Sequence, residues 1–553
     1  MNITSRPVML TKREIFAYYL TSIYFMYLVR SDQNSTMCDL NAAMNVWNVL
    51  PSWRCVGKLP SSACNWLGVS CASGNVVAIS LSQNALIGTI PSSLGTLSSL
   101  TYLSFSQNSI YGKIPSSLKG LSVITTILLN QNKLTGSLSW MKYPFPMLQT
   151  VDLSGNNING TLPTEVGSIT SLTTLFLGNN ILTGFLPSSL IKLTNCLKLS
   201  LSYNKFTGTL PTAIFSSMTK LTLFTAGSNK LYGTIPTASS LSSITLLDVS
   251  FNSFTGSIPT SIGACSNLVT LYVTANQLKS SIPSTISLLT NLQFLSFGTN
   301  SFTGTIPSSL ALLSSALIRL HINTTSIGGT IPSQLGYLSN LVQLQLDTNS
   351  LIGSLPSSLG NLVKLNLMDA SVNSLSGTIP TLYGKLSQIQ FMRLRNNRLQ
   401  GSLPSTLVFC TKLSTFYVYQ NSLSGSIPSS LGLMSSILFM YMDANSLTGS
   451  IPTTFSSASK LLSLRLSYNR LLGSIPTALG GMTSLTKLDI SFNAFTGSVP
   501  SQLCGRKLQS LIVTGNSGLT CFDNCFASGI ITSSNLTACA PSSAPTWTPT
   551  IPP

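Results

Sequence analysis

An asparagine returns at almost constant spacing along most of this 553-residue chain. The interval is about 24 residues, and one slot of the series holds Thr325 instead. A fixed period of this size is typical of architectures built by stacking similar units, and it argues against a string of unrelated globular domains. The asparagines are Asn84, Asn108, Asn132, Asn156, Asn180, Asn204, Asn229, Asn252, Asn276, Asn300, Asn349, Asn373, Asn397, Asn421, Asn445, Asn469, Asn493 and Asn516.

The residues around each asparagine repeat as well, and they describe a short strand followed by a tight return of the chain. Before Asn349, the apolar Leu344 and Leu346 alternate with polar neighbours, which is the pattern of a strand with one buried face. The asparagine side chain can donate and accept hydrogen bonds, so it can satisfy backbone groups buried in the turn. Gly353 and Pro356 then favour a change of direction on the far side.

One copy of this unit cannot fold alone. Its few apolar side chains bury too little surface to offset the conformational entropy that about 24 ordered residues lose. Neighbouring copies must supply the missing stabilisation through a shared core and a parallel strand ladder. The pattern therefore predicts a right-handed solenoid of about 19 coils with caps at both ends.

The repeat resembles the plant-type leucine-rich repeat, L-x-x-L-x-L-x-x-N-x-L-x-G-x-I-P-x-x-L-G-x-L, which residues 341–362 match almost throughout. The segment CNWLGVSC at 64–71 resembles the N-terminal cap of plant receptor-like ectodomains and polygalacturonase-inhibiting proteins. The resemblance implies an α/β solenoid, a leucine-rich repeat horseshoe or superhelix of about 19 repeats. A parallel β-sheet would form its concave face, short 3-10 or irregular segments its convex side, and disulfides its caps.

This interpretation divides the chain into five segments. They are a signal peptide or signal anchor at 1–31, a cysteine-containing cap at 32–77, the solenoid at 78–503, the last repeat with a cysteine-rich cap at 504–540, and a Ser/Thr/Pro-rich tail at 541–553. The tail and the cysteine-rich C-terminal cap resemble those of kinetoplastid leucine-rich repeat surface antigens.

The N-terminus predicts export. Lys12 and Arg13 precede an apolar stretch at 15–29 that is long for a signal h-region and short for a membrane span, which needs about 20 residues. We expect cleavage near Asp32, with an uncleaved anchor as the alternative. The protein would then be secreted or held at the cell surface, with possible membrane association through this segment.

The cysteines agree with an oxidising compartment, because eight of the eleven cluster at the two ends of the chain. Each cluster predicts two disulfides, and we prefer Cys38 with Cys55 and Cys64 with Cys71, although sequence leaves other pairings open. A zinc site is the poorer interpretation in an exported chain. The C-terminal cluster comprises Cys504, Cys521, Cys525 and Cys539.

Composition narrows the function. Only 7% of the residues are charged, one is histidine, and the net charge is +18. The basic residues are scattered and form no run interleaved with aromatics, so we expect no nucleic-acid partner. We also expect no enzymatic activity, metal or cofactor.

One stretch of outward-facing sheet positions differs from the Ser- and Thr-rich remainder. Tyrosine and arginine without many aliphatics are typical of binding hot spots, so we predict a ligand-binding patch on the concave face. The alternative is that these cross-strand neighbours only stabilise the ladder, by about 0.2–1 kcal/mol per pair. The predicted patch comprises Asp347, Asp369, Phe391, Arg393, Arg395, Tyr417, Tyr419, Tyr441, Asp443 and Arg465.

Two further residues, His321 and Asn323, are expected at outward positions of the same sheet. His321 lacks a well-placed acid and is interpreted as structural rather than catalytic. Asn323 belongs to an acceptor sequence for N-glycosylation and falls in the repeat that has Thr325 in place of the recurring asparagine. The predicted glycosylation sites are Asn34, Asn159, Asn323 and Asn535.

Together these features predict a non-catalytic extracellular protein that recognises a protein, peptide or glycan ligand. The alternatives are a surface-coat or display protein, which the bland face and stalk-like tail favour, and an inhibitor of a pectin-degrading enzyme, which rests on family analogy.

Overall fold

The computed structural model describes residues 33–53, 55, 63–504, 507–522, 531–532 and 536–539. It divides into two compact units, Met1–Thr255 and Gly256–Pro553. The predicted signal segment and tail, together with Cys525 and Asn535, lie outside the described residues.

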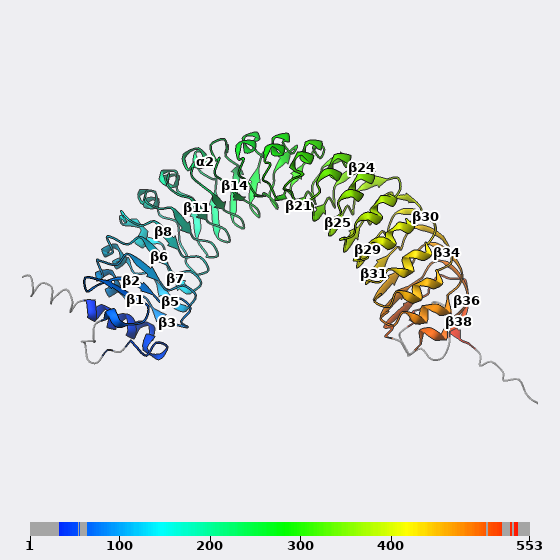
Figure 1. The fold of residues 1–553 in the computed structure, drawn as a ribbon, viewed down its shortest axis with the longest axis horizontal. Coiled ribbons are helices and arrows are strands. Elements are labelled where there is room, and N and C mark those ends of the chain that lie inside the picture. Colours follow the sequence, from blue (N-terminus) through cyan, green and yellow to red (C-terminus); the bar gives the residue numbers. More distant parts are fainter. Residues whose placement is uncertain are drawn as a thin grey trace, which may run out of the picture. The chain divides into compact units, whose positions relative to one another are not determined.

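The first unit stacks its coils so that one short strand of each joins a parallel sheet (Figure 1). Successive strands pair without slippage, so that Leu103 lies beside Ile127 and Ile127 beside Val151. The same repeat position therefore recurs in line along the sheet. These strands are β2 (Asn75–Ser80), β4 (Tyr102–Ser104), β6 (Thr126–Leu128), β8 (Thr150–Asp152), β9 (Thr174–Phe176), β11 (Lys198–Ser200), β13 (Leu223–Thr225) and β15 (Leu246–Asp248).

The second unit repeats this arrangement, and its strands keep the same register, as Met368 beside Met392 and Met392 beside Phe416 show. Its sheet strands are β17 (Thr270–Tyr272), β19 (Phe294–Ser296), β21 (Arg319–His321), β23 (Gln343–Gln345), β25 (Leu367–Asp369), β27 (Phe391–Arg393), β29 (Thr415–Tyr417), β31 (Phe439–Tyr441), β33 (Ser463–Arg465), β35 (Lys487–Asp489), β37 (Ser510–Ile512) and β39 (Ile531–Thr532).

The recurring asparagines are called ladder asparagines. After most of them the chain forms a second strand of two to six residues, whereas after Asn156 it makes only the isolated bridge between Thr161 and Thr183. In the first unit these are β3 (Ile87–Thr89), β5 (Ser109–Lys113), β7 (Lys133–Thr135), β10 (Thr183–Phe185), β12 (Lys205–Gly208), β14 (Lys230–Thr234) and β16 (Ser253–Thr255). In the second they are β18 (Lys279–Ser280), β20 (Ser301–Phe302), β22 (Gly328–Thr330), β24 (Ser350–Ser354), β26 (Ser374–Ser376), β28 (Gln400–Gly401), β30 (Ser422–Ser426), β32 (Ser446–Gly449), β34 (Arg470–Ser474), β36 (Ala494–Val499), β38 (Gly518–Phe522) and β40 (Thr537–Ala538).

The return side of each unit consists mainly of 3-10 helices, most of which follow a proline in extended conformation, such as Pro356. Proline fits here because the first turn has no use for its missing N–H. In the first unit these helices are Ser92–Thr96, Ser116–Gly120, Ser139–Lys142, Thr164–Ser168, Ser188–Lys192 and the α-helix α2 (Ile214–Ser217), and the segment before the first coil adds the 3-10 helices Val46–Asn48 and Ala63–Asn65. In the second they are Thr260–Ala264, Ser284–Leu288, Ser308–Leu313, Ser333–Tyr337, Ser357–Asn361, Thr381–Lys385, Ser405–Phe409, Ser429–Leu433, Thr453–Ser457, Thr477–Gly481 and Ser501–Leu503.

The ladder asparagines hold neighbouring coils together. The Nδ2 of Asn397 donates to the carbonyl oxygens of Ala370 at 2.9 Å, Leu394 at 3.2 Å and Arg395 at 3.2 Å. Its Oδ1 accepts from the backbone N–H of Leu375 at 3.0 Å. One side chain thus satisfies backbone groups of two coils, which is the role that its donor and acceptor capacity predicts.

Apolar side chains fill the interior of the coils, and leucines such as Leu344 and Leu346 are almost fully buried. Three cysteines are buried in this core as thiols, and burial raises the pKa of Cys196 to about 12 and of Cys265 and Cys410 to about 11. They are therefore protonated and shielded core side chains.

Both ends carry disulfides. At the N-terminal end, Asn41 of a helix over 33–44 donates through Nδ2 to the Trp53 carbonyl at 3.1 Å. The ring centroids of Trp53 and Trp66 lie 4.7 Å apart, and β1 (Val69–Ala72) pairs antiparallel with β2. The disulfides there join Cys38 to Cys55 and Cys64 to Cys71. At the C-terminal end Cys521 is bonded to Cys539, and Cys504 is also disulfide-bonded.

Candidate functional site

The patch lies on the outward face of the second unit's sheet and is ordered by strand register. The position four residues before each ladder asparagine forms one row, in which Arg393 lies beside Tyr417 and Tyr441 beside Arg465. An aspartate stands at each end of this sequence of four. In order, the row is Asp369, Arg393, Tyr417, Tyr441, Arg465 and Asp489.

The tyrosines form one aromatic cluster. Tyr417 and Tyr441 are stacked, with ring centroids 4.6 Å apart and planes at 9°. Tyr419 approaches both rings at 6.2 and 6.5 Å, and Phe439 meets Tyr441 edge-on at 6.4 Å. The rings are half-buried, so each keeps an accessible surface.

Arginines border this cluster at cation–π distance. The guanidinium of Arg465 lies 5.0 Å from the Tyr441 ring centroid and 5.7 Å from that of Tyr419. Arg393 lies 5.4 Å from the ring of Phe391. The predicted Tyr and Arg residues are therefore neighbours in space, not only in the repeat pattern.

Two of these arginines are paired with buried aspartates. Arg465 Nη2 lies 2.9 Å from Asp443 Oδ2, and Arg393 Nη1 lies 3.5 Å from Asp369 Oδ2. Burial raises the pKa of Asp443, and the charge of Arg465 opposes that shift. The Oδ1 of Asp443 and the Nε of Arg393 are buried with no hydrogen-bond partner among the described residues.

Arg395 and Asp347 stand outside these ion pairs. Arg395 lies 5.6 Å from the ring centroid of Tyr419 and makes a long hydrogen bond of 3.4 Å to Asn396 Oδ1. No carboxylate of the described residues lies within 4.0 Å of the charged groups of Arg395. Burial raises the pKa of Asp347, and the nearby charge of Asp369 adds to that shift.

His321 sits on the same face, between Ser296 and Gln345 in the neighbouring strands. One ring nitrogen, Nε2, lies 3.2 Å from Gln343 Oε1, and burial lowers the pKa of the imidazole. The described residues contain no group of three or more His, Cys, Asp or Glu able to hold a metal ion.

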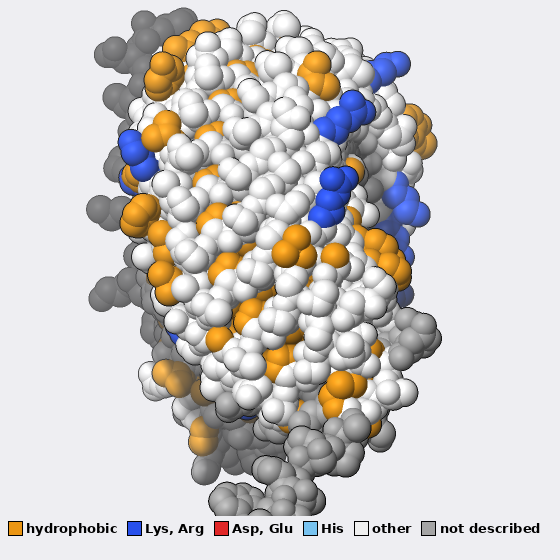
Figure 2. Space-filling model, turned by 90° about the vertical axis from the view of Figure 1, so that its right-hand side faces the viewer, with side chains coloured by type: hydrophobic (Ala, Val, Ile, Leu, Met, Phe, Trp, Pro, Cys, Tyr) orange, Lys and Arg blue, Asp and Glu red, His pale blue; other side chains and the backbone are white. Residues whose placement is uncertain are grey.

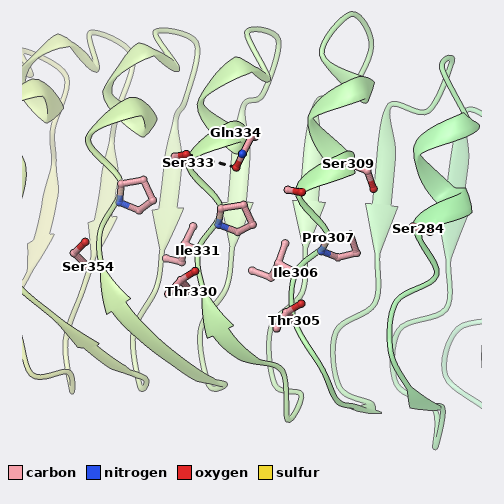
Figure 3. A pocket seen from close by; sticks show the side chains of 13 residues that line it. Ser284, Thr305, Ile306, Pro307, Ser309, Thr330, Ile331, Ser333, Gln334 and Ser354 are labelled. Carbon is pink, nitrogen blue, oxygen red and sulfur yellow. Dashed lines mark hydrogen bonds between the residues drawn. The ribbon is translucent and has the colours of Figure 1, made fainter.

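A separate groove lies away from this patch, between the short strands and the 3-10 helices of the second unit (Figure 3). It has a volume of about 800 Å³, and Ile306, Pro307, Ile331 and Pro332 line it together with serines and threonines. It carries no charged side chain, and its lining follows directly from the repeated Ile-Pro-Ser sequence. Figure 2 views the molecule from the right-hand side of Figure 1 and shows a surface that is mostly backbone and side chains neither apolar nor charged, with scattered apolar residues and a few Lys and Arg.

The exposed pair Tyr468 and Phe492 was missed by the sequence analysis. Their rings are stacked at 4.3 Å and 11°, and both residues immediately precede a ladder asparagine. That position has a left-handed backbone with φ of 52° in both residues, which turns the side chain away from the strand alternation. A search of the residues that precede the ladder asparagines would have found them.

The sequence comparison agrees with this architecture. Residues 440–495 match a leucine rich repeat family, and a related leucine rich repeat family matches five further segments. Comparison with curated proteins gives no significant match. The five segments are 99–121, 147–169, 171–193, 243–265 and 291–313.

Three solved structures illustrate the similarity. The plant peptide hormone receptor RGFR1 in complex with RGF2 is 33% identical, with a TM-score of 0.73, covering 81% of this chain and 70% of that one. A TDR receptor is 29% identical, with a TM-score of 0.71 and coverage of 84% and 89%. The ectodomain of the Arabidopsis receptor kinase HAESA, in complex with an IDA peptide hormone, is 27% identical, with a TM-score of 0.62 and coverage of 89% and 98%.

The stacked coils, the asparagine ladder and these matches define a class of protein: the chain belongs to the leucine-rich repeat family. Its structural similarity is to the ectodomains of plant receptors. The disulfides and this similarity are consistent with an extracellular or cell-surface protein. Within the described residues, no helix has the length and apolar character needed to cross a bilayer.

Proposed function

We propose that this protein is a secreted or cell-surface recognition protein that binds a protein or peptide ligand, without catalysis, on the sheet face of its second unit. The observation that carries the proposal is the stacked pair Tyr417 and Tyr441 between Arg393 and Arg465. Half-buried aromatic rings bordered by arginine are the composition of interface hot spots.

The ligand chemistry follows from which groups already have partners. Arg393 and Arg465 are engaged by Asp369 and Asp443, so their charges are largely compensated within the protein. Arg395 has no such carboxylate among the described residues. We therefore expect a ligand that places an apolar or aromatic group on the tyrosine rings and an acidic group at Arg395.

The comparisons support a peptide or protein ligand. RGFR1 and HAESA are described in complexes with RGF2 and an IDA peptide hormone. The same fold at 27–33% identity makes ligand recognition on a repeat surface a reasonable transfer to this chain.

The test is selection of peptides from a display library on the full chain, followed by calorimetry of the enriched peptides. Tyr417→Ala and Arg395→Ala should each weaken binding about tenfold or more, since hot-spot truncations cost about 2 kcal/mol. Matched controls exist on the same face, because Tyr272 occupies the corresponding row and Arg319 lies at another outward position. Tyr272→Ala and Arg319→Ala should bind like the parent protein.

Equal binding by all four variants, or no enriched peptide at all, would contradict a peptide-binding patch. Failure to enrich any peptide would favour the alternative of a surface display protein. One observation supports that alternative. In the first unit, the row two residues before the ladder asparagines contains only small or amide side chains: Ser82, Ser106, Asn130, Ser154, Gly178, Ser202, Gly227 and Ser250.

A further inference from the structure

The one repeat without a ladder asparagine has a rearranged hydrogen-bond network. In a regular coil, Asn373 Nδ2 donates to the carbonyls of Leu346, Ala370 and Ser371 at 3.0, 3.2 and 3.1 Å. Thr325 has a single hydroxyl, which donates to Asn349 Oδ1 and lies 3.4 Å from the backbone nitrogen of Ile327. A threonine cannot supply the two amide donors of asparagine, so this coil gives up ladder bonds.

The same threonine completes an acceptor sequence for N-glycosylation, Asn323-Thr324-Thr325. Its asparagine stands two residues before the ladder slot and therefore belongs to an outward row of the sheet face. The backbone there is held in register, since Thr299 N–H donates to the Asn323 carbonyl at 2.9 Å and Thr324 N–H to the Asp347 carbonyl at 2.8 Å.

The side chain of Asn323, in contrast, is not engaged. Its amide makes no hydrogen bond to any described residue, and neither of its polar atoms is fully buried. The neighbouring coil has Gly298 where the amide lies, and a Cβ there would come within 2.4 Å of Asn323 Oδ1. The half-exposed amide therefore needs the space that this glycine leaves.

We propose that Asn323 carries an N-linked glycan. The threonine at position 325 completes this acceptor site, and the coil loses ladder hydrogen bonds as a result. The inference rests on the export of the chain that the proposed function includes, but not on any ligand. The glycan stands beside Asp347 and limits the binding patch on that side, because a bulky sugar there blocks a ligand from extending along the face toward the coil of Asn300.

The other described acceptor sequences differ in their surroundings. Asn34 lies in the helix over 33–44, and the hydroxyl of its Thr36 is buried and bonded to Thr96. Asn159 is exposed, its backbone N–H donates to the Gly136 carbonyl at 2.8 Å, and the following Gly160 has φ of 77°. The Asn159 peptide therefore serves as a reference in the same sample.

The experiment uses the full chain expressed in a eukaryotic host and recovered from the medium or the cell surface. Peptides are treated with an N-glycosidase in ¹⁸O-water, which converts a glycosylated asparagine to labelled aspartate. Labelled Asn323 is the expected result. An unlabelled Asn323 peptide from exported protein overturns the proposal whether or not Asn159 is labelled, and it leaves ligand binding untouched.

Two variants separate the modification from the fold. Thr325→Ser keeps the acceptor sequence, and the label at Asn323 should remain. Thr325→Asn destroys the acceptor sequence and restores the ladder residue, so the label should be lost. In an Asn323→Gln background, where neither protein carries a glycan at this site, Thr325→Asn should raise the melting temperature. An unchanged or lower melting temperature for Thr325→Asn would contradict the idea that the threonine costs ladder bonds.

Discussion

Tyr417 and Tyr441 stack face to face from adjacent strands, with their ring planes at 9°. This contact contributes to the ladder as well as to the surface, so its effect on stability has to be separated from any effect on binding. An aromatic pair contributes about 0.5–1.5 kcal/mol beyond its buried area. We expect Tyr417→Ala to lower stability by about this amount in thermal unfolding, and Tyr417→Phe to leave it nearly unchanged.

A loss of several kcal/mol in Tyr417→Ala would indicate that the cluster is mainly structural. In that case weakened ligand binding by the same variant would carry no information about recognition. Arg395→Ala then becomes the decisive variant, because no ion pair of the described ladder depends on it.

A second prediction concerns the ladder asparagines. Asn397→Ala removes the donors to Ala370 and Leu394 and the acceptor for Leu375. Buried backbone groups left without a partner cost about 1–3 kcal/mol, so the melting temperature should fall clearly. Asn366→Ala is the control, since this half-exposed side chain makes no hydrogen bond to another described residue. Equal effects of the two variants would argue against the ladder as a source of stability.

The periodic part of the fold was predictable from the sequence for a physical reason. Leu344, Leu346 and Asn349 occupy positions whose burial and hydrogen bonding are dictated by stacking, and the repetition makes each position readable many times over. Of the two ion pairs, that of Arg393 with Asp369 follows strand register because the two residues are neighbours in one row, but the other pair does not. Arg465 pairs with Asp443, which lies in a different row, so the diagonal reach of a long side chain decides the partner rather than strand register.

Backbone strain was invisible to the sequence analysis, and it gives a third prediction. Val372 precedes a ladder asparagine with φ of 54°, whereas Gly155 and Gly515 occupy the equivalent position with φ of 69° and 70°. A β-branched residue in the left-handed region costs roughly 1–3 kcal/mol. Val372→Gly should therefore raise the melting temperature.

The control for this variant is Val363→Gly. Val363 is also exposed, but it does not have a positive φ, so glycine should only add flexibility to the unfolded chain and lower stability by about 0.5–1 kcal/mol. Destabilisation by both changes would show that Val372 gains more from its contacts than it loses in strain.

The last prediction concerns Asp347, whose pKa is raised by burial and by Asp369. A folded-state pKa above the unfolded value of about 3.9 means that the native protein binds the proton more readily than the unfolded chain. The stability that this group contributes is therefore fully present below about pH 4 and is lost as the pH rises through the folded pKa.

Asp347→Asn removes this penalty, so it should melt at a higher temperature than the parent at neutral pH, and the difference should shrink as the pH falls toward 4. Asp39→Asn, at an exposed helical position, is the control and should melt like the parent protein. A parent protein more stable than Asp347→Asn at neutral pH would mean that the hydrogen bond from Thr348 or the longer-range attraction of Arg395 outweighs the desolvation of the carboxylate.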